Sequence, residues 1–177
     1  MPLPRQIARA VSHTAAIALA AVASIGAGLG ASAANATPVH SDAPAPPGCT
    51  GPVSNTWIDV VAEGMRNGNG LLAITLYADN SKKFLVKHGS MYVGRVDAKA
   101  GETRGCIFVP KPGVYVFALY HDENGNQSFD RSGFGLPVEG YGFSNNPSTL
   151  AGLPSFKSVR LNIPRSGLVT RVQMKYP

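Results

Sequence analysis

The alternation of apolar and polar residues along the chain predicts short β-strands. Residues 55–63 read N-T-W-I-D-V-V-A-E, and only one of the two alternating sets is uniformly apolar, namely Ile58, Val60 and Ala62. Residues 71–78 alternate in the same way, with an apolar set formed by Leu72, Ile74, Leu76 and Ala78. Side chains two positions apart share a strand face, so we expect both sets to face a common core. The intervening 64–70 segment contains N-G twice, which is typical of a turn.

Further segments have the composition of strands, and no long helical pattern follows the N-terminal region. They are residues 91–96, 103–109, 114–120, 155–163 and 168–176. A tight turn at Pro112-Gly113 predicts that 103–109 and 114–120 form an antiparallel hairpin. A polar stretch, 79–83, is expected to begin with one helical turn. About seven short strands at intervals of roughly ten residues indicate an all-β fold, an antiparallel β-sandwich of immunoglobulin-like or transthyretin-like type.

Residues 1–36 have the three-part pattern of a cleaved signal peptide. Arg5 and Arg9 precede an uncharged apolar stretch centred on residues 15–25, and A-x-A sequences follow at 31–33 and 34–36. The apolar stretch is rich in Ala and Gly and falls short of the roughly 20 strongly apolar residues of a membrane-spanning helix. No later segment is long enough to span a bilayer. We therefore expect an exported protein, periplasmic or secreted, cleaved at either A-x-A site, with no membrane span after signal removal.

The chain after the signal divides into a linker and one domain. Residues 37–48 contain four prolines in twelve positions, which excludes a helix or a central strand. Residues 49–177 are long enough to form one domain with its own core. Loss of Arg5 and Arg9 with the signal lowers the net charge from +6 to +4. The remaining basic residues are scattered and lack a stacking motif, so the sequence predicts no nucleic-acid binding.

Cys49 and Cys106 are the two cysteines of the chain. In an exported protein an isolated pair is most simply a disulfide. Such a bond would tie the first residue of the domain to the 103–109 strand. A metal–thiolate site and two free thiols are the alternatives, and no C-x-x-C spacing supports either.

The segment 121–146 differs in character from the apolar strand that precedes it. Side-chain oxygens occupy relative positions one, three, five and nine, on Asp122, Asn124, Asn126 and Asp130. A chain that curls around a hard cation presents alternate side chains inward, and calcium takes about six to eight oxygen ligands. The backbone carbonyl of Ser128 would be a further ligand. This spacing predicts a calcium site, and the alternative is a turn in which Asx side chains cap their own backbone.

The EF-hand pattern is only half met in this segment. Its glycine position holds Gln127 and its final glutamate position holds Gly133. Glu139 could supply a bidentate carboxylate only if the loop folds back. The remaining candidate contacts for a ligand or partner are His121, Phe134, Glu139, Tyr141, Phe143, Asn145 and Asn146. For the aromatic residues of this set, and for Phe129, the alternative is that they fold back and cap the core.

These residues favour an exported, non-catalytic protein of unassigned biochemical role, whose 121–146 loop binds calcium or an unknown extracytoplasmic partner. The alternative is a hydrolase-type enzyme that uses the loop carboxylates and His121 for acid–base chemistry. The chain has no nucleophile elbow, H-E-x-x-H or P-loop to support it. A third interpretation is a transition-metal site that combines His121 with His88 or Asp122. Single histidines at strand ends more often hydrogen-bond to the backbone.

Several motifs together resemble a bacterial exported family catalogued as domain of unknown function 2141. They are the 64–70 turn, the Pro112-Gly113 turn with its strand, the H-D-E-N-G-N run at 121–126 with Asp130, and the G-L-P-V-E-G-Y-G-F-S-N-N run at 135–146. The resemblance covers about residues 55–176 and implies an exported β-sandwich of unassigned role. The family usually has Gly where this chain has Gln127, which predicts backbone strain there. It also usually has Lys-Leu where this chain has Ser128-Phe129. The H-D-E-N-G-N run is also similar to calcium loops in B-type adhesin modules.

Overall fold

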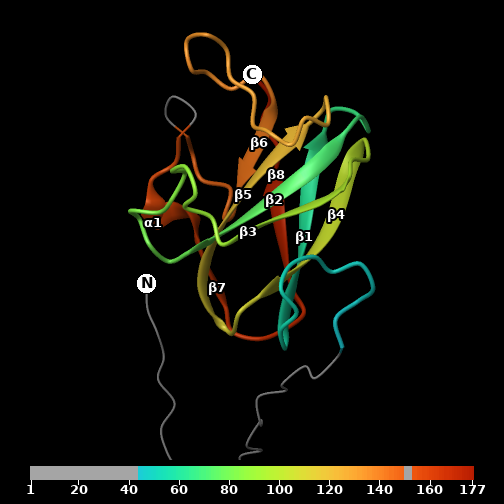
Figure 1. The fold of residues 1–177 in the computed structure, drawn as a ribbon, viewed down its shortest axis with the longest axis vertical. Coiled ribbons are helices and arrows are strands. Elements are labelled where there is room, and N and C mark those ends of the chain that lie inside the picture. The colour runs from blue at the N-terminus through green and yellow to red at the C-terminus, as the bar shows by residue number, and fades with distance from the viewer. Residues whose placement is uncertain (1–43, 150–152) are drawn as a thin grey trace, which may run out of the picture. The chain divides into compact units, whose positions relative to one another are not determined.

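Two β-sheets face each other across a shared apolar core (Figure 1). The structure is a computed structural model that describes residues 44–149 and 153–177; the predicted signal peptide, 1–36, lies outside them. Its elements are β1 (Thr56–Met65), β2 (Leu71–Ala78), β3 (Tyr92–Asp97), β4 (Gly101–Val109), β5 (Gly113–Asp122), β6 (Gly140–Phe143), α1 (Phe156–Val159), β7 (Arg160–Ile163) and β8 (Leu168–Gln173). One sheet has the order β4-β1-β8, and the other has the order β3-β2-β5-β6 with β7 paired to β5. The predicted all-β architecture of two sheets with antiparallel strands is confirmed.

The core follows from the alternation that the sequence displays. Ile58, Val60 and Ala62 of β1 are fully buried, and Leu72, Ile74 and Leu76 of β2 are at most 2% exposed. These side chains meet Phe117 and Leu119 of β5 in one cluster between the sheets. The predicted inward position of Ala78 is not part of this cluster, because the strand ends there and the residue is only half-buried. One pair departs from the antiparallel pattern, since β1 and β8 run parallel.

The predicted hairpin between 103–109 and 114–120 is wrong. β4 pairs with β1 in one sheet, whereas β5 pairs with β2 in the other, so the Pro110–Pro112 connection crosses between the sheets. Two prolines in this connection lack the amide hydrogens that a tight antiparallel ladder requires. Thr56 at the start of β1 pairs with Val109, and this holds the end of β4 in its own sheet.

The prediction of one continuous strand over 155–163 is also wrong, because a helical turn, α1, precedes β7. Phe156 and Val159 are three residues apart, so one turn of helix places both on the same side. Val159 is fully buried and Phe156 packs on Phe84 with ring centroids 5.7 Å apart. β6, inside the glycine-rich segment, was not predicted. Among the described residues, no helix is long and apolar enough to cross a membrane.

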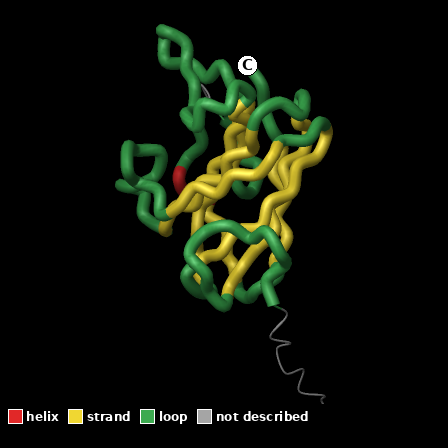
Figure 2. The backbone as a smooth tube through the Cα atoms, turned by 45° about the vertical axis from the view of Figure 1, so that its right-hand side comes forward, coloured by secondary structure: helices red, strands yellow, loops and turns green. Residues whose placement is uncertain are grey.

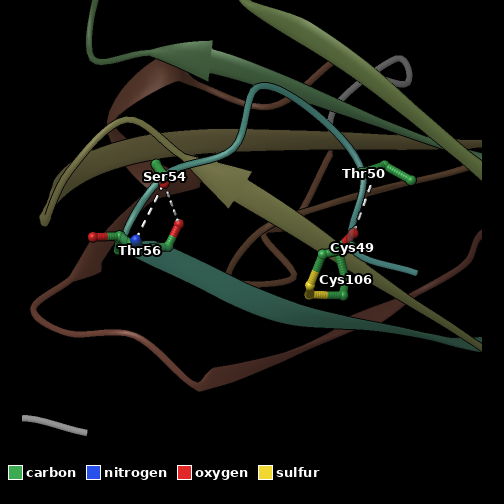
Figure 3. Close-up of a disulfide and its surroundings, with 5 residues drawn as sticks. All are labelled: Cys49, Thr50, Ser54, Thr56 and Cys106. Carbon is green, nitrogen blue, oxygen red and sulfur yellow. Dashed lines mark hydrogen bonds between the residues drawn. A yellow bond between two sulfur atoms is a disulfide. The ribbon is translucent and has the colours of Figure 1, made fainter. Parts of the chain in front are cut away.

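The predicted disulfide between Cys49 and Cys106 is present (Figure 3). It joins the start of the domain to β4, with the two Cα atoms 4.3 Å apart. Beside it, the Thr50 amide donates to the Cys106 carbonyl at 2.9 Å, and the Phe108 amide donates to the Thr50 carbonyl at 3.0 Å. The segment at residue 50 therefore covers the outer edge of β4, and the disulfide fixes it there.

Candidate functional site

The loop between β5 and β6 folds back on itself at one end of the sandwich (Figures 1 and 2). It leaves the sheet after Asp122, which pairs with Leu71, and re-enters at Gly140, which pairs with His121. Within it, the Ser132 amide donates to the Leu136 carbonyl at 2.8 Å, and the Val138 amide donates to the Asp130 carbonyl at 3.2 Å. This small hairpin returns the chain to Asp130, which is the folding back that brings Glu139 to the candidate site.

The first part of the loop is a set of turns held by Asx side chains. Asp122 is fully buried, and its two oxygens accept from the amides of Asn126 at 3.0 Å and Gln127 at 2.7 Å. The Asn124 side-chain oxygen accepts from the Asn126 amide at 2.9 Å, and the Asn126 side-chain oxygen accepts from the Ser128 amide at 2.8 Å. These bonds satisfy backbone donors that a tight loop leaves unpaired.

The four predicted side chains converge. One oxygen of Asp130, Oδ2, accepts from Nδ2 of Asn124 at 2.8 Å and from Nδ2 of Asn126 at 2.9 Å. Asp122 is joined to the same group through the Asn126 amide. The two amide nitrogens thus face Asp130. Ser128 contributes its amide to the cluster.

Glu139 completes this cluster from the far side of the loop. It is 5% exposed, and its Oε2 accepts from the Asp130 amide at 3.0 Å. Its Oε1 is buried and has no hydrogen-bond partner in residues 44–149 and 153–177. Burial, and then the negative charges of Asp130 and Asp122, raise the pKa of the Glu139 carboxyl above its ordinary value. Backbone hydrogen bonds from Asp130 and Glu123 act in the opposite direction and offset this rise only in part, so the ionised form is incompletely compensated.

Glu123 points away from the cluster. Its carboxylate accepts from Arg66 and from Nδ2 of Asn67 at 3.0 Å, which ties the loop to the turn between β1 and β2. Burial alone would raise the pKa of Glu123, but the hydrogen bonds from Asn67 and Arg66 outweigh it and lower that pKa. In the described part of the chain, no group of three or more His, Cys, Asp or Glu side chains has the arrangement of a metal site. An ion at this loop would therefore need amide and backbone oxygens as well.

His121 is part of the core. It is fully buried, with Nε2 at 2.8 Å from the Asn69 carbonyl and Nδ1 at 2.8 Å from the Tyr176 hydroxyl. A carbonyl only accepts, so Nε2 carries the hydrogen and a neutral ring accepts from Tyr176 at Nδ1. His88 is exposed in the connection that begins at the opposite end of β2. The two histidines of the transition-metal interpretation are therefore not brought together.

Gln127 adopts the left-handed conformation that its position predicts, with φ of 63°. Its carbonyl accepts from the Tyr120 hydroxyl at 3.2 Å and from the Arg95 guanidinium at 3.1 Å. On the Gln127 side, both bonds use only the backbone carbonyl, so they do not require a particular side chain there. They stabilise the turn although a residue with a Cβ disfavours this φ.

The remaining predicted contact residues divide into three groups. Phe134 is 96% exposed on the loop. Tyr141 and Phe143 belong to β6 and pack with ring centroids 6.0 Å apart. Asn145 donates to the Arg160 carbonyl at 2.7 Å, and Asn146 donates to the Arg171 carbonyl at 3.0 Å. The two asparagines therefore connect β6 to β7 and β8.

A second feature, which the sequence pattern did not predict, lies on the face of the β3-β2-β5-β6 sheet that points away from the main core. Tyr77, Ala118 and Phe143 form a separate apolar cluster there. Beside it lies a cavity of about 210 Å³ that is also lined by Thr75 and Phe129. The signal was present in β2, where Thr75 and Tyr77 occupy the alternate set that the core does not use.

Residues 60–170 match the profile of a family described as uncharacterized proteins conserved in bacteria (DUF2141), and this confirms the resemblance drawn from the motifs. No curated protein and no solved structure matches the chain at a significant level. The matched residues extend from β1 into β8 and include the whole β5–β6 loop.

Proposed function

The chain belongs to the bacterial DUF2141 family, and from its geometry we propose an exported, non-catalytic β-sandwich whose 121–146 loop binds calcium as part of a binding surface. One observation carries the calcium proposal. Oε1 of Glu139 is buried without a hydrogen-bond partner in the described residues, beside two further carboxylates that raise its pKa. A buried carboxylate oxygen without a partner is costly, and a divalent cation would supply both that partner and a compensating charge.

The proposed ligands come from both sides of the folded loop. Asp130 and Glu139 supply charge, and Asp122, whose two oxygens accept from the Asn126 and Gln127 amides, adds negative charge at the base. A half-turn of the Asn124 and Asn126 side-chain amides would replace the two nitrogens that face Asp130 with oxygens, which hard cations prefer. The Ser128 carbonyl completes the proposed set. The half-turn gives up the bonds that the Asn124 and Asn126 side-chain oxygens accept from the Asn126 and Ser128 amides, whereas the hydrogen bonds from backbone amides to Asp122 still hold the base of the loop.

Calcium is expected to raise the melting temperature of the mature protein, followed by circular dichroism. An ion at about 100 times its dissociation constant stabilises the folded state by roughly 2.7 kcal/mol. A chelator should reverse the shift. Magnesium should give a smaller shift, because it demands near-ideal octahedral geometry and gives up its water reluctantly.

Two isosteric variants separate ion binding from loop folding. Asp130→Asn and Glu139→Gln remove charge and keep the shape, so both should abolish the calcium response. Glu139→Gln should also raise the melting temperature in chelator, because it removes a buried charge that the loop compensates only in part. Glu102→Gln is the matched control, since Glu102 is an exposed carboxylate that pairs with Arg104 on β4. No measurable shift at millimolar calcium would reject the site and leave the loop as a hydrogen-bonded turn.

The non-catalytic part of the proposal is supported by His121. Both of its ring nitrogens are engaged, and the ring is fully buried. It therefore offers no free nitrogen for general acid–base chemistry beside the loop carboxylates.

Export is supported by the disulfide, because such bonds persist in oxidising compartments. We expect the mature protein to begin near residue 34 or 37, after one of the two A-x-A sequences. Intact mass and N-terminal sequencing of protein recovered outside the cytoplasm test this. A chain that still begins at Met1 would refute the signal-peptide proposal.

A further inference from the structure

The cavity on the outer face of the β3-β2-β5-β6 sheet has the features of a ligand site. Beside the larger Leu119 and Phe143, its buried lining includes two small side chains, Ala118 and Thr75, which are 8% and 7% exposed. Aromatic rings surround them in a connected series, with centroid distances of 5.5 Å for Tyr120–Phe129, 6.5 Å for Phe129–Tyr141 and 6.0 Å for Tyr141–Phe143. Small residues below a ring of large ones leave space that the chain does not fill.

Two hydroxyl groups in this cavity lack hydrogen-bond partners among the described residues. Thr75 and Tyr77 both line it, Tyr77 is 8% exposed, and neither hydroxyl makes a hydrogen bond to another described residue. Burial raises the pKa of Tyr77 above its ordinary value, as does the nearby Tyr120. Neither hydroxyl oxygen is sealed from solvent, so both are accessible within the cavity to a polar atom of a ligand.

One cation lies at the exposed side of the cavity. Arg131 stacks over the Phe129 ring, 4.9 Å from its centroid, and donates one hydrogen bond to the Gly135 carbonyl at 3.0 Å. It forms no ion pair with an Asp or Glu in the part of the chain that the structure describes, whereas Arg66, Arg104, Arg160 and Arg171 all do. Its remaining donors are therefore suited to an anionic group.

We propose that this cavity binds a single-ring aromatic carboxylic acid that carries a hydroxyl group at the far end of its ring. A volume of about 210 Å³ is below the roughly 300–1,000 Å³ of pockets for drug-sized ligands, so one ring with short substituents fits. The ring lies among the aromatic side chains, the carboxylate meets Arg131, and the hydroxyl meets Thr75 and Tyr77.

The separation of the polar groups supports a ligand substituted at both ends. Thr75 pairs with Ala118, two residues from the Ala73–Tyr120 pair, beside which Phe129 and Arg131 lie. Two residues along a strand span about 7 Å, which is comparable to the length of a para-substituted ring. A saccharide fits less well, because most of its hydroxyls would face Ala118, Leu136 and Phe143 without partners.

Leu85 adds independent support. It lines the cavity in a left-handed conformation, with φ of 55°, and it is 38% exposed. A bulky residue rarely adopts this conformation, and such outliers concentrate at sites that hold ligands.

The test is a titration of the ¹⁵N-labelled mature protein with 4-hydroxyphenylacetate, followed by two-dimensional NMR. Phenylacetate, 4-hydroxybenzyl alcohol and methyl β-glucoside serve as comparison probes. We expect saturable shifts at the amides of Thr75, Ala118 and Tyr141, with tighter binding of 4-hydroxyphenylacetate than of any comparison probe. All titrations are run both with calcium and with chelator, so that failure of the calcium proposal leaves this result independent.

Four variants identify the roles. Ala118→Leu should fill the cavity and abolish the shifts. Arg131→Gln should weaken binding of 4-hydroxyphenylacetate by about tenfold, the loss of roughly one charge-assisted contact, and should leave 4-hydroxybenzyl alcohol unaffected. Thr75→Val should remove the preference for the hydroxylated acid over phenylacetate. Arg165→Gln, in the exposed turn before β8, is the matched control for Arg131→Gln and should change nothing.

The outcomes that overturn the proposal are distinct. Binding of the acid to Ala118→Leu as tightly as to the unaltered protein would place the ligand elsewhere. Preference for methyl β-glucoside would refute the ligand class, and no saturable shift with any probe would refute the site. If Ala118→Leu does not fold, the Arg131→Gln and Thr75→Val results decide the proposal by themselves.

Discussion

Removal of the Cys49–Cys106 disulfide is expected to lower the free energy of unfolding by about 4 kcal/mol, on the chain-entropy model of a cross-link between cysteines 57 positions apart. For a domain of this size the melting temperature should fall by about 10–20 °C. The bond also holds the Thr50 segment against the edge of β4, and those two backbone hydrogen bonds would be free to open. Reduction should therefore act on both states. It should weaken contacts of the folded state and raise the conformational entropy of the unfolded chain.

The measurement is chemical denaturation of the unaltered protein with and without reductant, beside the Cys49→Ala/Cys106→Ala double variant. The double variant in reductant is the control, because reductant has no disulfide to act on there. Equal stability of the oxidised protein and the double variant would contradict the expectation. It would mean that the rest of the sandwich already fixes the Thr50 segment.

Among glycine-to-alanine substitutions near the loop, Gly70→Ala is expected to lower the free energy of unfolding the most. Gly70 has φ of 63°, and a Cβ there would lie 1.9 Å from the Asp122 carbonyl oxygen. That oxygen belongs to the backbone at the end of β5, so it cannot swing aside as a side chain would. A left-handed alanine and a displaced strand end together should cost about 2–5 kcal/mol.

Gly101→Ala is the matched control for this substitution. Gly101 also has a positive φ, 79°, but a Cβ there meets nothing within 4 Å. It should cost only the left-handed conformation, about 1–2 kcal/mol. Denaturation curves of both variants give the comparison, and amide shifts in the 121–130 segment should move for Gly70→Ala alone. Equal losses for the two variants would show that the approach to Asp122 carries no penalty.

The parts of the fold that sequence reasoning found are those governed by local alternation. Ile58, Val60 and Ala62 read as an inward set and are fully buried, because a strand repeats every two residues. β4 pairs with β1 and not with β5. The Pro112-Gly113 turn is compatible with either pairing, so it does not determine to which sheet β4 belongs. β6 was not predicted because Gly140 and Gly142 are poor strand formers. Glycine at these positions lets neighbouring side chains pack close to the backbone. A Cβ on Gly140 would lie 2.2 Å from the Tyr176 ring.

For the loop, local spacing predicted which side chains lie together, and their binding of an ion stays a prediction. The one-three-five-nine spacing identified side chains that do converge, since they lie within nine residues of one another. The sequence indicated only that Glu139 could reach the site if the loop folds back. That its Oε1 is buried without a hydrogen-bond partner among the described residues depends on the folded loop. The cavity unites Thr75, Ala118 and Arg131 from three distant segments, and no spacing rule connects them.

The two ends of the sandwich differ in a way that matters for handling the molecule. Residues 44–55 enter at the end opposite the β5–β6 loop, whereas the C-terminus lies at the loop end (Figure 1). Tyr176, next to last in the chain, hydrogen-bonds to His121 and to the Arg66 amide. A support or fluorescent label attached ahead of residue 49 would thus leave the loop facing solvent. The same attachment after Pro177 would lie close to the loop and would disturb the hydrogen bonds of Tyr176.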